Sequence, residues 1–62
     1  MNGVILFCDH DEEGKIIDSL TGERVIPQRQ YMCFFYLVGT TTEQVLANIP
    51  NYRVVNGELT LV

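Results

Sequence analysis

The sequence YMCFFYLV, residues 31–38, places eight consecutive apolar side chains in a chain of 62 residues. Successive side chains of a β-strand point to opposite faces, so a strand with one solvated face shows polar residues at alternate positions. Residues 31–38 are apolar at both the odd and the even positions. The stretch therefore predicts a central strand of a β-sheet, covered on both faces.

The composition of the remaining chain also favours strands. Val, Ile and Thr supply 17 residues and Ala only one, and β-branched side chains pack well on a pleated surface. Residues 4–8 (VILFC) are a second short apolar run, which predicts another strand with both faces covered. Residues 9–14 are polar and end in Gly, which is typical of a loop.

A tight hairpin is predicted around Asn56-Gly57, because both central residues of a type I′ turn need positive φ. The two-residue loop fixes how residues 52–55 pair with residues 58–61. The predicted partners are Val55 with Glu58, Val54 with Leu59, Arg53 with Thr60 and Tyr52 with Leu61. A slip by one residue would turn every apolar side chain to the other face.

A second hairpin is predicted within residues 15–26. Leu20 and Thr21 can form the centre of its turn, and Gly22 can take the left-handed position of a bulge. This register alternates an opposite-charge pair with an apolar pair, namely Asp18 with Arg24 and Ile17 with Val25.

One short helix is predicted after residue 40, because two overlapping capping boxes begin there. The candidate pairs are Thr40 with Glu43 and Thr41 with Gln44. Pro50 disfavours helical backbone at the residue before it, so the helix should end near Asn48.

The elements therefore follow the order β-β-β-β-α-β-β. They predict a single α+β domain over residues 1–62, in which one short helix packs on one face of a small, mostly antiparallel sheet of about five strands. One helix cannot cover both faces of residues 31–38, so we expect a homodimer or a larger oligomer packed sheet to sheet. The predicted interface consists of Tyr31, Cys33, Phe35 and Leu37. The alternative is a strongly curled sheet that closes on itself as a small barrel.

The net charge of −4 argues against a nucleic-acid-binding surface. Four of the eight acids lie within residues 9–13, and the other four are balanced by the four bases. A DNA mimic would spread its carboxylates over a whole face, which a single acidic loop does not do. A sheet that stacks single-stranded nucleic acid on its aromatic residues also needs a basic groove, and this chain has only three Arg and one Lys.

The acidic loop also resembles the opening of a calcium loop. Asp9, Asp11 and Glu13 occupy its first, third and fifth places and Gly14 its sixth, but Leu20 stands where a bidentate Glu is expected. A weak calcium site at these three acids is the main alternative function, and a solvated turn accounts for the same residues.

The chain lacks a complete catalytic or zinc-binding set. Cys8, His10 and Cys33 supply three of the four ligands that zinc wants, unless Asp11 joins them. Both Cys residues lie in apolar runs, where Cys is usually a small buried hydrophobe, although a disulfide between them is feasible if their strands pair. We therefore expect no enzyme activity and no cofactor.

These observations predict a small non-enzymatic protein that binds another protein, as a regulator, inhibitor or assembly component. No apolar run approaches the roughly 20 residues that span a bilayer, and no basic segment precedes the first strand. Two Cys residues are too few for a disulfide framework. We therefore expect a cytoplasmic protein with no membrane segment.

Overall fold

The computed structural model describes residues 3–62, and over these residues it contains five strands, one α-helix and one 3₁₀ turn. In chain order they are β1 (Gly3–His10), β2 (Ile16–Gly22), β3 (Cys33–Val38), α1 (Thr42–Asn48), η1 (Ile49–Asn51), β4 (Tyr52–Val55) and β5 (Glu58–Leu61). Every strand pair is antiparallel. The predicted α+β class is confirmed, but the strands form two sheets, with orders β2-β1-β3 and β4-β5.

The central strand of the larger sheet is β1, so the prediction that residues 31–38 are central is wrong. The pairs of β1 with β3 run from Gly3 opposite Val38 to Cys8 opposite Cys33. Only β1 has a strand on each side, while β3 lies at an edge. Apolar residues at every position predict that both faces of a strand are apolar. They do not reveal how many neighbouring strands it has.

The predicted hairpin within residues 15–26 is also wrong, because residues 16–22 form one continuous strand against β1. Asp18 lies opposite Asp9 rather than Arg24, and the register shifts beside this pair. The side chain of Thr21 donates to the carbonyl of Ile5 (2.8 Å), and Gly22 has no positive φ. A long antiparallel ladder with a buried central strand makes more hydrogen bonds than the short local hairpin, and it buries β1 at the same time.

The real turn between β1 and β2 is the acidic loop. The Asp11 carboxylate accepts hydrogen bonds from the backbone amides of Glu13 and Lys15, both at 2.9 Å. Gly14 has φ +85, and its carbonyl accepts from the backbone amide of Val54 on β4 (2.8 Å). The loop therefore closes the first hairpin and connects the two sheets.

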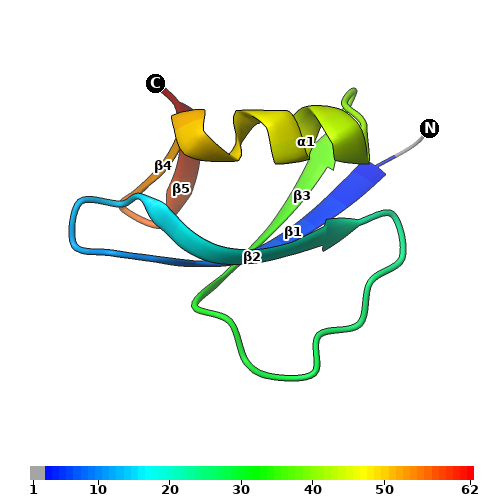
Figure 1. The fold of residues 1–62 in the computed structure, drawn as a ribbon, viewed down its shortest axis with the longest axis horizontal. Coiled ribbons are helices and arrows are strands. Elements are labelled where there is room, and N and C mark those ends of the chain that lie inside the picture. The colour runs from blue at the N-terminus through cyan, green and yellow to red at the C-terminus, as the bar shows by residue number, and fades with distance from the viewer. Residues whose placement is uncertain (1–2) are drawn as a thin grey trace.

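Helix α1 and the β4-β5 hairpin cover one face of the larger sheet, which we call the inner face (Figure 1). Its core contains Val4, Leu6, Cys8, Val45, Tyr52 and Val54. The helix uses the second predicted capping box, Thr41 with Gln44, and ends at Asn48 as predicted. The register predicted for the C-terminal hairpin is confirmed at all four pairs.

Candidate functional site: the outer face of the three-stranded sheet

The outer face is the side of the β2-β1-β3 sheet that is turned away from α1. On β3 the burial alternates, because Phe34, Tyr36 and Val38 point outward and are 57%, 58% and 54% exposed. The other three residues of β3 pack against the inner core; they are Cys33, Phe35 and Leu37. Three of the four residues predicted as interface therefore lie on the covered face. The exposed apolar face is formed instead by Phe34, Tyr36 and Val38.

The fourth predicted residue, Tyr31, lies over the outer face in an aromatic cluster. The Phe7 ring centroid is 5.9 Å from that of Tyr31 and 5.2 Å from that of Phe34, with tilted planes in both pairs. The Arg29 guanidinium lies 3.7 Å from the Tyr31 ring centroid, in cation–π geometry. These contacts leave Phe7 half-buried, while its neighbours on β3 remain exposed.

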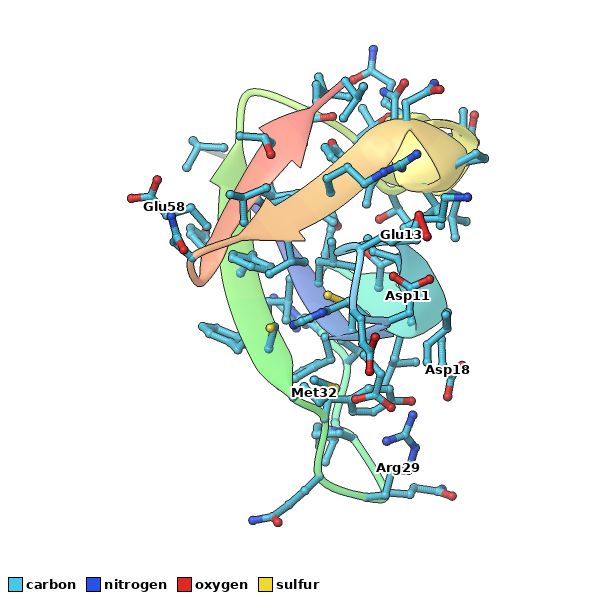
Figure 2. All side chains as sticks on the ribbon, turned by 90° about the vertical axis from the view of Figure 1, so that its left-hand side faces the viewer. Asp11, Glu13, Asp18, Arg29, Met32 and Glu58 are labelled. Carbon is cyan, nitrogen blue, oxygen red and sulfur yellow. The ribbon has the colours of Figure 1, made fainter. Side chains whose placement is uncertain are left out.

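Arg29 also joins two carboxylates that face each other across β1 and β2. Asp9 and Asp18 are register partners, and like charges directly opposite in a sheet repel. Arg29 bonds both, at 2.8 Å from an Asp9 oxygen, and the Met32 amide donates to the other Asp9 oxygen (2.8 Å). Figure 2 shows the Arg29 side chain, from the long β2–β3 connection, beside Asp18. The amide of Met32 and then Arg29 lower the pKa of Asp9, and hydrogen bonds to both acids raise the pKa of Arg29.

The acids of the predicted calcium site do not converge. Asp9 is engaged by Arg29 and Met32, the Asp11 carboxylate closes the turn, and Glu13 is exposed to solvent. Figure 2 shows Asp11 and Glu13 in the β1–β2 loop, apart from Arg29. Within residues 3–62, no group of three His, Cys, Asp or Glu side chains is placed to hold a metal ion.

Cys8, His10 and Cys33 are likewise not assembled into a zinc site or a catalytic pair. The His10 ring Nδ1 donates to the backbone carbonyl of Asp11 (2.8 Å). Cys8 lies in the core, where burial and then the neighbouring Cys33 thiol raise its pKa to about 11. A thiol with this pKa is protonated at neutral pH and is a poor nucleophile.

Two features of this site carry no local signal in the sequence. The role of Arg29 depends on a contact with Asp9 and Asp18, which are 20 and 11 residues away, and on a strand pairing different from the predicted one. The covered face of β3 could not be chosen from residues 31–38, since both faces are apolar. The β1–β3 register and the position of α1 together decide which face of β3 is covered.

The fold and the outer face thus define a small α+β domain with an uncovered sheet face. No family model, curated protein or solved structure matches the chain. In the part of the chain that the structure describes, the helices are too short to cross a bilayer. The surface of residues 3–62 has no pocket.

Proposed function

We propose that this protein is non-enzymatic and acts through protein–protein contacts, as a regulator, inhibitor or assembly component. We further propose that it forms a homodimer through the edge strand β3. The observation that carries this proposal is the combination of an edge position with three outward apolar side chains, Phe34, Tyr36 and Val38. Aromatic residues of this kind are enriched at contact surfaces between proteins.

A comparison of the two edges of the sheet supports the choice of β3. The β2 edge carries the charged Asp18, and the β1–β2 register shifts next to the Asp9–Asp18 pair. A charged side chain and an irregular register both oppose edge-to-edge pairing. The six residues of β3 read CFFYLV, with no charge, Pro or Gly. A strand edge without such features is a template for another strand, because its backbone donors and acceptors point outward.

A second copy of this chain is an occupant of suitable charge and shape. Two β3 strands related by a two-fold axis at Phe35 would pair antiparallel, so that Phe34 of each copy lies opposite Tyr36 of the other. Each aromatic pair would contribute about 0.5–1.5 kcal/mol beyond its buried area. The net charge of −4 opposes self-association, but Asp11 and Glu13 lie in the β1–β2 loop, on the side of the sheet away from β3 (Figure 2), and Asp9 is paired with Arg29. Repulsion between copies from this loop is therefore weakest at β3.

Size-exclusion chromatography with light scattering tests the proposal at micromolar concentration. We expect the wild type to have twice the chain mass of 7.1 kDa and Tyr36→Lys to have the monomer mass, because an edge Lys opposes strand pairing. Ile26→Lys is the matched control: Ile26 is 88% exposed in the β2–β3 connection, and the charge change is the same. This control should remain dimeric.

Circular dichroism must show that the Tyr36 variant is folded. If Tyr36→Lys does not fold, Val38→Lys, at the end of β3, replaces it as the test variant. A wild type with a mass of 7.1 kDa, or a Tyr36→Lys dimer, would refute association through this edge.

A further inference from the structure

The two thiols of the chain face each other across β1 and β3. Cys8 and Cys33 are register partners. Both lie on the inner face, where Cys8 is part of the core and Cys33 packs against it. Directly opposite residues in an antiparallel pair have Cα atoms about 4.5–5.5 Å apart, within the range of about 4.4–6.8 Å that a disulfide spans. Their side chains share a face. Directly opposite Cβ atoms are about 4.5–5.5 Å apart and a disulfide takes about 3.5–4.5 Å, so the two strands need only a small approach to join them.

We propose that Cys8 and Cys33 are an oxidisable dithiol, which a low-molecular-weight disulfide such as oxidised glutathione converts into an intrachain disulfide. The product is a covalent link between the central strand β1 and the edge strand β3. It closes a ring over residues 8–33, which contains all of β2 and the long β2–β3 connection. Both residues are thiols in the structure, so this is the reduced form.

Burial sets the order of the two exchange steps. Cys33 is half-buried and Cys8 is fully buried, so the Cys33 thiolate attacks the oxidant and releases one small thiolate. Cys8 then loses its proton to water, and its sulfur attacks the Cys33 sulfur and displaces the second small thiol. Two protein S–H bonds and one oxidant S–S bond are replaced by one protein S–S bond and two small-molecule S–H bonds. The protein loses two electrons and the oxidant gains them.

The link should stabilise the fold, because it restricts the unfolded chain over a long ring. We expect a rise in Tm of roughly 10 °C or more for a domain of this size. The second step should be slow at neutral pH and faster in alkali, since burial and the neighbouring thiol raise the pKa of Cys8 to about 11.

The test is to equilibrate the reduced wild type with oxidised and reduced glutathione, both in native buffer and in concentrated urea. Samples are quenched with acid and weighed by mass spectrometry. We expect a monomeric product that has lost two hydrogens and carries no glutathione. The oxidation equilibrium constant should be at least about tenfold larger in native buffer than in urea. If the disulfide stabilises the folded state, then by thermodynamic linkage folding favours disulfide formation by the same free energy.

Two variants separate the steps. Cys8→Ala should stop at a stable mixed disulfide between glutathione and Cys33. If that variant does not fold, Cys33→Ser serves instead, and it should remain unmodified because Cys8 is fully buried. The proposal is overturned if the native wild type stays reduced, stops at the mixed disulfide, links two chains, or oxidises no more readily than in urea.

Discussion

Replacing Gly14 by Ala tests how the β1–β2 loop holds the two sheets together. Gly14 has φ +85, and an added Cβ would lie 2.5 Å from the carbonyl oxygen of Val54. Left-handed backbone costs an L residue about 1–2 kcal/mol. Backbone atoms must also move apart, which disrupts the 2.8 Å hydrogen bond from the Val54 amide to the Gly14 carbonyl, at about 0.5–1.5 kcal/mol.

The expected loss in the free energy of unfolding is therefore about 1.5–3.5 kcal/mol. A domain of this length has a total of about 3–9 kcal/mol, so Tm should fall by roughly 6–28 °C. Urea denaturation followed by far-UV circular dichroism measures the loss. Gly39→Ala is the matched control, because Gly39 has φ +79 but no atom within 4 Å of the added Cβ. The control retains the backbone strain and lacks the clash, and if both variants lose the same stability, the tight approach to β4 does not contribute.

Three further predictions address the packing of β3 and the ionisable groups. Phe35→Asp should abolish the cooperative melt, because a carboxylate on the inner face costs several kcal/mol, whereas Phe34→Asp on the exposed face should still melt cooperatively; equal behaviour would contradict the assigned faces. The pKa of Asp9 lies below its ordinary 3.8, so its stabilising effect is present above that pH and is lost as the pH falls through the lower folded value. Arg29→Gln should therefore lower Tm most at neutral pH, and a deficit that persists unchanged in strong acid would exclude this cause. The raised pKa of Cys8 stabilises the protein below pH 9.0, and this effect is lost as the pH rises toward about 11. Between pH 9.0 and about 11, Cys8→Ala should lose less free energy of unfolding than the wild type, with each protein compared with its own value at neutral pH. Urea titrations at several pH values measure this difference.

The features predicted well from the sequence are those that depend on neighbouring residues. Asn56 and Gly57 both have positive φ, as a two-residue turn requires, and the pairing of β4 with β5 follows from the loop length alone. The Thr41–Gln44 box and the effect of Pro50 on the end of α1 are equally local. No distant contact is needed to specify any of them.

The errors arise where two distant solutions compete for the same residues. Residues 20–22 suit a hairpin turn by their residue types, but the pairing of residues 16–22 with β1 satisfies more backbone groups and covers a strand that would otherwise lack a second neighbour. Once that pairing forms, Asp9 and Asp18 are brought together, and Arg29 bonds both carboxylates. The repulsion between Asp9 and Asp18 cannot be predicted from a sequence pattern, because the tertiary structure alone brings the two carboxylates together.

The sequence by itself determined the class of the fold, the C-terminal hairpin, the helix and the two candidate boxes for its cap, and the excess of apolar side chains in residues 31–38. Alternation, turn chemistry and capping act over a few residues, and the printed order of residues contains them. Only the tertiary structure decided that β1 is central, that Cys33, Phe35 and Leu37 face the core, and that Cys8 meets Cys33. The free energy that decides these features comes from burial and pairing between segments far apart in the chain, and it depends on which surfaces α1 and the β4-β5 hairpin cover.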